Sequence, residues 1–459
     1  MSTIKVNTVT KRTGSTLTLG ESGTTVTLAC GATQTGFGRT GTVNWVTTKK
    51  TTGFTAVSGE GYFCDTAASG AFTLTLPSSP SAGDIVGFKD YNGNFATANL
   101  TIGRGGSPIN GSNSADVTIS TAGASIFLVY VDASQGWVAT QDDESTFAGE
   151  AFLTATGGTI TTSGDCKIHT FTSSGNFVVS QLSSTPAQNE VSYMVVGGGG
   201  GAGTGANADG HEGGAGGGAG GFRELKSPTT PYTASPLDGY PSAPNRITVT
   251  AATFPIVVGA GGAGGCQPGT PPFTTGYPGT VGSNSSFSTI TGAGGGKGGS
   301  GGPSSPGNGG NGGSGGGSGA ANCNAGTGNT PPVSPAQGTN GTVGSSSAGG
   351  AGGGATAAAG ASTNNNGADG GAGATTSINA TPTAFAGGGG GAGETTKGCG
   401  GAGGGGAGYT NGSNGAGSGV AGTTNTGGGG GGAFSNSGCT ATAGGAGGSG
   451  VVIIRYKFQ

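Results

Sequence analysis

Alternating apolar and polar positions predict short β-strands near the start of the chain. In STLTLGESGTTVTLACGATQTG, apolar residues alternate with threonine and glycines interrupt the pattern; the apolar positions are Leu17, Leu19, Val26 and Leu28. A period of two residues with many β-branched side chains is typical of strands. So few strands cannot bury their own apolar face. We therefore expect this segment, residues 1–52, to need partners, from other copies of the chain or from a larger assembly, and we predict a homotrimer.

Residues 53–141 carry further alternating runs that are separated by turn signals. AFTLTLPSSPSAGDIVGFKDYNG is typical of a strand, a Pro-Ser loop, a second strand and an Asn-Gly turn, and ASIFLVYVDASQGWVAT adds further strands. The spacing predicts a small β-sandwich. In such a module we expect the aromatic residues to be core rather than ligand contacts: Phe72, Phe127, Tyr130 and Trp137.

A polar stretch at 142–165 is predicted to be a linker, and a second group of strands is predicted after it. These strands are predicted at 166–171, 176–180, 191–197, 246–250 and 254–259, with a last one in the C-terminal sequence VVIIRYKF. Because strands precede and follow the glycine-rich region, we expect a β-base whose sheet contains both 191–196 and 451–458. Residues 166–459 would then form one domain, in an all-β chain.

The glycine-rich region cannot contain an ordinary hydrophobic core. Glycine supplies 113 residues of the chain, mostly after Gly197, and between 291 and 450 the charged and aromatic residues are few. One interpretation is a flexible tract. The other is a set of packed polyproline-II-like helices, which have three residues per turn and no internal hydrogen bonds. GNGGNGGSGGGSG favours packing, with Asn308, Asn311 and Ser314 lining one edge.

Composition and charge exclude several classes of function. Only 8% of the residues are charged, the net charge is -3 and there is no basic run, so we expect no binding to nucleic acid. The seven cysteines form no CxxC motif, and His169 and His211 are far apart, so we expect no metal or cofactor. Most cysteines are expected to be buried thiols, with a Cys399–Cys439 disulfide as the alternative. We find no catalytic constellation.

Several stretches resemble a known family. LTLGESGTTVTLACGATQTGFG resembles a β-repeat of fibre proteins of marine tailed phages, and GYFCDTAASGAFTLTLPSSPSAGDIVGFKDYNG looks like a module of phage, including cyanophage, tail fibres. YMVVGGGGGAG, FPIVVGAGGAGG and GGSGVVIIRY resemble the glycine-rich C-terminal domain of such fibres. The resemblance implies a trimeric virion protein that is made in the host cytoplasm. Its N-terminus would join other virion tail proteins, and its C-terminus would face the host. A related class of phage adhesins packs glycine helices.

These features rank four classes of function. The first is a phage tail fibre that binds a host surface glycan or outer-membrane protein without chemistry. The alternatives are a purely structural virion fibre of the head, neck or tail, an antifreeze-like glycine-helix protein and, last, an enzyme. Receptor contacts are expected in the inserts at 222–247 and 266–287, at the tips of the glycine tract; the alternative is that their aromatic rings cap the lattice. The candidates are Tyr232, Tyr240, Phe273 and Tyr277.

Overall fold

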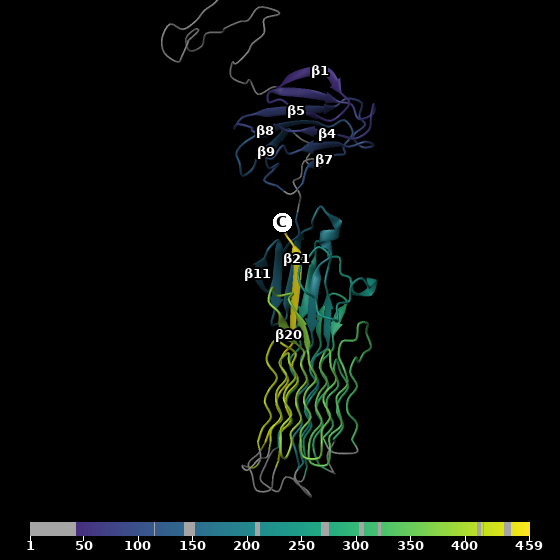
Figure 1. Cartoon of the computed structure of the whole chain (residues 1–459), viewed down its shortest axis with the longest axis vertical. Coiled ribbons are helices and arrows are strands. Elements are labelled where there is room, and N and C mark those ends of the chain that lie inside the picture. Colours follow the sequence, from purple (N-terminus) through teal and green to yellow (C-terminus); the bar gives the residue numbers. More distant parts are fainter. Residues whose placement is uncertain are drawn as a thin grey trace, which may run out of the picture. The chain divides into compact units, whose positions relative to one another are not determined.

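The computed structural model describes residues 43–113, 115–141, 152–206, 212–267, 275–302, 307–319, 323–410, 415, 417–435 and 442–459 (Figure 1). The chain divides into two compact units, Met1–Gly149 and Glu150–Gln459. Strands dominate both units, and the helices of the described part are two short 3-10 helices, η1 (Pro186–Asn189) and η2 (Ala243–Asn245). The predicted all-β fold is confirmed. Within the described ranges, neither helix is long or apolar enough to cross a membrane.

The first unit contains two sheets around a common core. One sheet contains, in order, β1 (Asn44–Lys50), β3 (Glu60–Cys64), β5 (Ile85–Asp90), β8 (Ser125–Tyr130) and β9 (Trp137–Gln141). The other contains β2 (Phe54–Thr55), β4 (Phe72–Thr75), β6 (Leu100–Gly103) and β7 (Val117–Ile119). Successive strands from β1 to β6 alternate between the two sheets, so that neighbours within each sheet run parallel.

The aromatic residues expected in this core differ in burial. Trp137 is fully buried, and Phe72 and Tyr130 pack against the buried cluster. Phe127 lies outside the cluster: it pairs with Gly87 across the sheet, and its ring centroid lies 6.0 Å from that of Trp45. Alternation alone gives a strand two possible inward faces, and here Phe127 lies on the outward one.

The second unit contains two five-stranded sheets, which we call the β-base. One contains β10 (Thr154–Thr156), β13 (Gly175–Gln181), β16 (Thr253–Val257), β17 (Ser285–Phe287) and β18 (Ile290–Gly292). The other contains β11 (Thr159–Ser163), β12 (Cys166–Phe171), β21 (Val451–Lys457), β14 (Ser192–Val196) and β15 (Phe222–Leu225). The C-terminal β21 pairs with β14, which confirms the predicted closure of the glycine region by the last strand.

Two predictions about the β-base were wrong. Residues 154–163 of the supposed linker form β10 and β11, because threonine-rich strands pair readily and Leu153 and Ala155 reach the core. The segment 246–250 forms no strand. Although Ile247 and Val249 are buried, the segment makes only an isolated bridge to Glu190, which directly follows η1.

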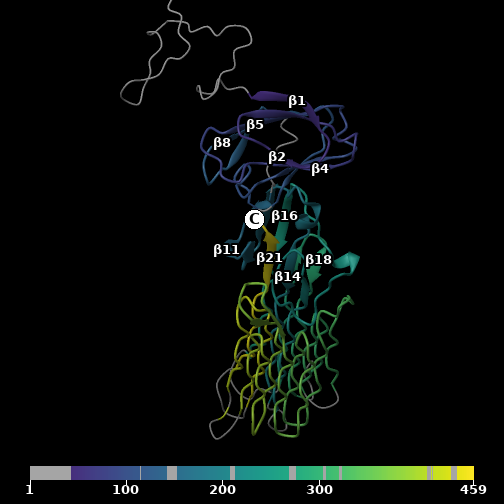
Figure 2. The ribbon, with the colours of Figure 1, turned by 45° about the horizontal axis from the view of Figure 1, so that its top comes forward.

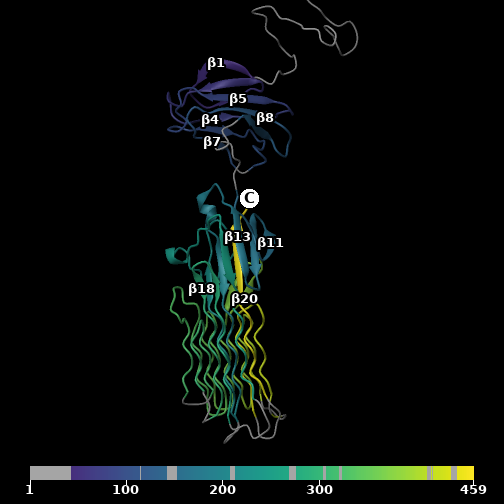
Figure 3. The ribbon, with the colours of Figure 1, turned by 180° about the vertical axis from the view of Figure 1, so that it is seen from behind.

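The glycine-rich region forms a lattice of extended segments that leave the β-base and return to it (Figures 1 and 3). In the segment 197–206, three consecutive N–H groups donate to three different segments. Gly199, Gly200 and Gly201 donate to the carbonyls of Gly448, Gly218 and Thr280 at 2.9, 2.8 and 2.9 Å, respectively. The pattern then repeats, since Ala202 donates to Gly445. A repeat of three residues is that of a polyproline-II-like helix.

The carbonyls of the same helix accept from three further segments, so it has six neighbours. Those of Gly198, Gly199 and Gly200 accept from the N–H groups of Gly295, Gly262 and Gly430, respectively. Figure 2 accordingly shows a bundle several layers deep. A Cβ on Gly199 would lie 2.0 Å from the Gly428 carbonyl oxygen, so the close packing excludes any side chain there.

Small polar side chains complete the hydrogen bonding at one edge of the lattice. The exposed Asn308 and Asn311 accept from the N–H groups of Asn324 and Thr327, both at 2.8 Å. Their spacing of three residues thus matches the helical repeat. Ser314 does not share this edge, contrary to expectation. The chain bends at 312–314, and Ser314 is buried, where its hydroxyl donates to the Gly354 carbonyl.

Candidate functional site

The predicted receptor contacts do not form one surface. The insert at 222–247 begins as β15 and packs on the β-base, where the Tyr193 hydroxyl donates to the Asn245 carbonyl over 2.7 Å. The insert therefore does not lie at the tips of the glycine tract, where we had expected it. Tyr277 lies in the helix 275–284, near the end farthest from the β-base, since that helix enters β17. At the rise per residue of a polyproline-II-like helix, the residues between Tyr277 and β17 span roughly 25 Å.

The individual aromatic residues also differ in accessibility. Tyr232 is half-buried, with its ring 5.4 Å from the Arg455 guanidinium, and burial raises the pKa of its hydroxyl well above the usual range. Tyr240 and Tyr277 are 39% and 40% exposed, respectively. Phe273 lies outside the described residues. Tyr232 thus behaves as a packing residue, whereas Tyr240 and Tyr277 remain single exposed rings on different parts of the unit.

A buried polar cluster holds the insert and the lattice together. Glu224 accepts from the Ser235 N–H at 2.9 Å and from the Thr376 hydroxyl at 2.5 Å. Thr376 ends β19 (Ala374–Thr376), which forms a hairpin with β20 (Thr383–Phe385) inside the glycine-rich region. Burial raises the pKa of Glu224. Because the carboxyl group joins two segments, its role is structural.

The histidine and cysteines in the described part have packing roles or lie singly. His169 is buried in β12, with Nδ1 2.7 Å from the Gly157 carbonyl oxygen and its ring stacked on Tyr456. Cys64 and Cys166 are buried thiols, as expected, but Cys266 and Cys399 are exposed. The exposed positions are compatible with the lattice, because a side chain as small as cysteine fits on its surface as well as in its interior. Cys439, the proposed partner of Cys399, lies outside the described residues.

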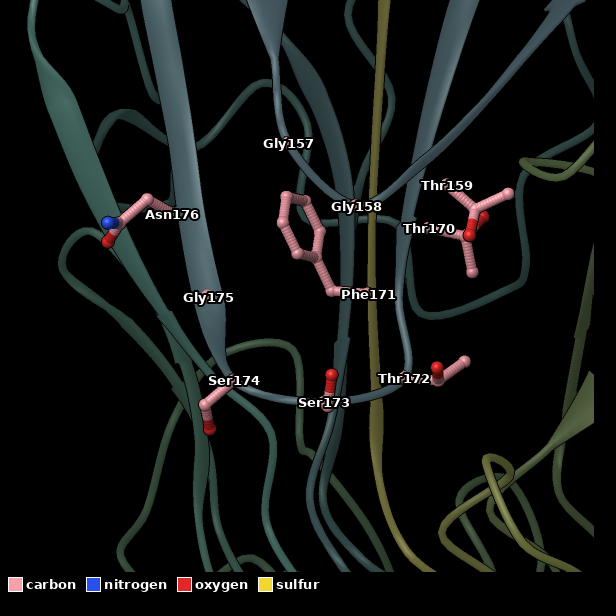
Figure 4. Close-up of a pocket in the computed structure, with 10 residues that line it drawn as sticks. All are labelled: Gly157, Gly158, Thr159, Thr170, Phe171, Thr172, Ser173, Ser174, Gly175 and Asn176. Carbon is pink, nitrogen blue, oxygen red and sulfur yellow. The ribbon is translucent and has the colours of Figure 1, made fainter.

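A first hollow lies on the β-base beside Phe171 and has a volume of about 340 Å³. Figure 4 shows the Phe171 ring between the turn at Gly157 and Gly158 and the strand that contains Gly175. Gly157 and Gly158 have φ of +114° and +63°, and a Cβ on Gly157 would lie 2.0 Å from the Asn176 carbonyl oxygen. Since Phe171 is only 3% exposed, its ring supports the turn and offers no open face to a ligand.

A second, larger hollow of about 660 Å³ lies at the end of the lattice farthest from the β-base, and we call it the distal hollow. Its lining residues are Ser345, Ser362, Thr363, Asn364, Asn365, Asn366 and Thr395. Its position follows from chain direction: the segment after 366 runs into β19, and the segment before 394 leaves β20. β19 and β20 lie at the β-base, because Thr376 bonds to Glu224.

Hydrogen bonds fix the backbone of the distal hollow. The Asn364 carbonyl accepts from the Ser345 hydroxyl at 3.1 Å and from the Ser347 N–H at 3.2 Å. The Asn365 carbonyl accepts from the Thr395 N–H at 2.9 Å. Three separate turns of the lattice therefore meet here and hold one another in place.

The three asparagine side chains of the distal hollow differ in how they are used. The Asn366 amide is held on both sides, donating to the Thr363 hydroxyl at 3.0 Å and accepting from the Thr396 hydroxyl at 2.7 Å. Asn364 and Asn365 are exposed, and their side-chain amides make no hydrogen bond to any part of the chain that the structure describes. These two amides can bind a ligand without breaking an internal contact.

The chemistry of the distal hollow is that of binding. Every lining side chain is an uncharged hydroxyl or carboxamide. Such groups donate and accept hydrogen bonds but do not titrate near neutral pH. The predicted aromatic residues Tyr232, Tyr240 and Tyr277 are not among the lining residues. The sequence signal for this site is the run STNNNG at 362–367, where three consecutive asparagines interrupt the glycine pattern.

The comparisons with known proteins identify the second unit. A family model described as a glycine-rich domain matches residues 171–457, which is more than half of the chain. The chain therefore belongs to the glycine-rich domain family. No curated protein matches it.

Proposed function

We propose that this chain is a tail-fibre protein of a tailed phage that attaches the virion to a host-surface receptor by non-catalytic binding. The observation that carries the proposal is the distal hollow, an open polar surface at one end of the lattice. Within the described residues, its Asn364 and Asn365 side chains make no internal hydrogen bond. The resemblance of the N-terminal repeat, the 53–141 module and the glycine-rich termini to phage fibres supports the same function. The protein would then be made in host cytoplasm and assembled into the virion.

The lattice suits a receptor-binding role because it positions the distal turns rigidly. The segment 197–206, for example, is hydrogen-bonded to six neighbouring segments of the lattice. Groups that are already ordered lose little entropy when a ligand binds. The N-terminal segment would attach the chain to other tail proteins and would associate with other copies of the chain as a homotrimer. Native mass measurement of the soluble chain tests the trimer; a stable folded monomer would contradict it.

Competition with virions tests the attachment function. Purified full-length protein, added to host cells before the phage, is expected to reduce adsorption in a concentration-dependent way. Asn364→Ala/Asn365→Ala protein should compete much less, whereas Asn176→Ala, at an exposed asparagine of the first hollow, should compete like the wild type. If the wild-type protein neither binds host cells nor blocks adsorption, while virions lacking it still infect, the purely structural fibre is the better assignment.

A further inference from the structure

We propose that the distal hollow binds an uncharged saccharide rather than an anionic glycan or a protein surface. This inference rests on the proposed attachment function and specifies its ligand. Its basis is the composition of the hollow together with the side-chain amides of Asn364 and Asn365, which make no hydrogen bond to the described residues.

The lining groups match the hydrogen-bonding character of sugar hydroxyls. A carboxamide has two donor hydrogens and an acceptor oxygen, and a serine or threonine hydroxyl both donates and accepts. Neighbouring hydroxyls on a sugar ring likewise donate and accept. Ser362 and Thr363 lie beside the two amides on one turn, so a single ring could contact several of these groups at once.

Charge argues against an anionic ligand. Carboxylate and phosphate groups are bound most strongly by arginine and lysine, through charge-assisted hydrogen bonds. The lining residues include neither. Glu394 and Lys397, which flank Thr395 and Thr396 in the sequence, carry opposite charges, so the segment 394–397 has no net charge. An anionic sugar would lose hydration here without gaining a cationic partner.

The shape and polarity of the site argue against a protein surface. Protein contacts of high affinity are centred on buried aromatic or apolar anchors. The distal hollow is open and has no apolar lining residue, since its lining side chains are all hydroxyls or carboxamides. Its volume lies within the range of about 300–1,000 Å³ that is typical of small-ligand sites. Since neutral hydrogen bonds give weak binding singly, attachment would depend on several copies of the site acting together.

The inference is tested with the full-length protein and defined oligosaccharides. Saturation-transfer NMR is performed with a panel of neutral hexose and N-acetylhexosamine oligosaccharides and with a matched panel that carries uronate, sialate or phosphate groups. We expect saturation transfer to at least one neutral saccharide, and none to the anionic panel. Losing one neutral hydrogen bond weakens binding by about twofold to tenfold, and the double variant loses two. The Asn364→Ala/Asn365→Ala variant should therefore lose the signal.

Two controls separate loss of binding from loss of structure. The alanine pair should unfold thermally like the wild type, because neither side chain makes an internal hydrogen bond within the described residues. Asn366→Ala should instead lower the unfolding temperature, since Asn366 joins Thr363 to Thr396. Asn176→Ala should leave saccharide binding unchanged.

The outcomes distinguish the ligand from the function. If no neutral saccharide binds, or if the alanine pair binds it like the wild type, the inference is overturned. If the alanine pair abolishes adsorption to cells but only a host protein or an anionic glycan competes, the saccharide assignment is wrong while the attachment function stands. If wild-type protein does not adsorb to host cells at all, the attachment function itself is wrong.

Discussion

Arg455, in the last strand of the chain, donates a hydrogen bond to the Ile378 carbonyl oxygen over 3.3 Å. Ile378 follows β19 in the middle of the glycine-rich region, and a second guanidinium nitrogen of Arg455 donates to the Pro231 carbonyl over 2.9 Å. One side chain thus joins the C-terminal strand, the lattice hairpin and the insert on the β-base. The C-terminal strand therefore stabilises the lattice through side chains as well as through its pairing.

Substituting Arg455 should destabilise the second unit strongly. In Arg455→Met, the carbonyl oxygen of the buried Ile378 loses its donor, and an orphaned buried polar group costs about 1–3 kcal/mol. The Pro231 carbonyl, at an exposed residue, also loses its bond to Arg455. Urea unfolding measures the loss. Arg455→Lys keeps a charge but cannot reach both carbonyls with one planar group, so it should fall between Met and wild type. Equal stability of all three proteins would contradict the assigned role.

Deleting residues 451–459 should unfold the glycine-rich lattice. β21 lies between β12 and β14, and its removal separates two strands that otherwise have no direct pairing. The lattice begins directly after β14, so its first helix would lose its anchor. Hydrogen exchange is expected to become fast across residues 291–450. Native protection in the truncated chain would show that the lattice is stable without the C-terminal strand.

Interior glycines should tolerate no side chain, whereas edge glycines should tolerate one. A Cβ on Gly199 would lie 2.0 Å from a backbone oxygen of the neighbouring helix, and the backbone cannot move without displacing other segments. Gly199→Ala is therefore expected to prevent folding of the second unit, as read by thermal unfolding. Gly360→Ala is the matched control, because its nearest neighbouring atom would be 3.5 Å away. That variant should be as stable as the wild type or slightly more stable.

The β-base could be predicted from the sequence because its strands carry ordinary apolar patterns. The segment 166–171 was predicted with the bounds that β12 has, and the presence of 191–196 and the C-terminal strand in one sheet was also predicted. The strands at 154–163 were missed, because their many threonines do not alternate with apolar residues and so do not indicate which face of the strand is buried. Burial of Leu153 and Ala155 depends on partners far away in the sequence.

The lattice and the candidate site were predictable to different degrees. A repeat of three residues indicates polyproline-II-like helices, but it does not show where each helix turns. Ser314 was consequently placed on an edge, although the chain bends before it. Likewise, aromatic side chains were favoured as receptor contacts because rings are conspicuous in a glycine-rich sequence. The distal hollow depends instead on three turns that only folding brings together, at 345–347, 362–366 and 394–396.

The asparagines at the lattice edge should stabilise it by accepting hydrogen bonds. Asn311→Ala leaves the Thr327 N–H without its acceptor, and because the site is exposed the expected loss is about 0.5–1.5 kcal/mol. Asn311→Asp keeps an acceptor oxygen and should recover most of this loss. Asn365→Ala is the matched control, since no internal bond depends on that side chain in the described part of the chain. Chemical denaturation of the four proteins provides the measurement. If Asn311→Ala and Asn365→Ala change the stability equally, the hydrogen bond that Asn311 accepts does not stabilise the lattice edge.

The buried carboxyl group of Glu224 should make the second unit less stable as the pH rises. Burial raises the pKa of Glu224 in the folded protein, so the folded state keeps its proton to a higher pH than the unfolded chain does. The free energy of unfolding therefore falls as the pH increases from about 4.3, the ordinary value for glutamate, through the folded pKa. Glu224→Gln cannot ionise, and its amide can still accept from Ser235 and donate to the Thr376 hydroxyl. The variant should match the wild type near pH 4 and exceed it in stability at pH 8, as measured by urea unfolding at both values. A less stable variant at pH 8 would mean that the hydrogen bonds to the carboxylate outweigh the cost of its burial.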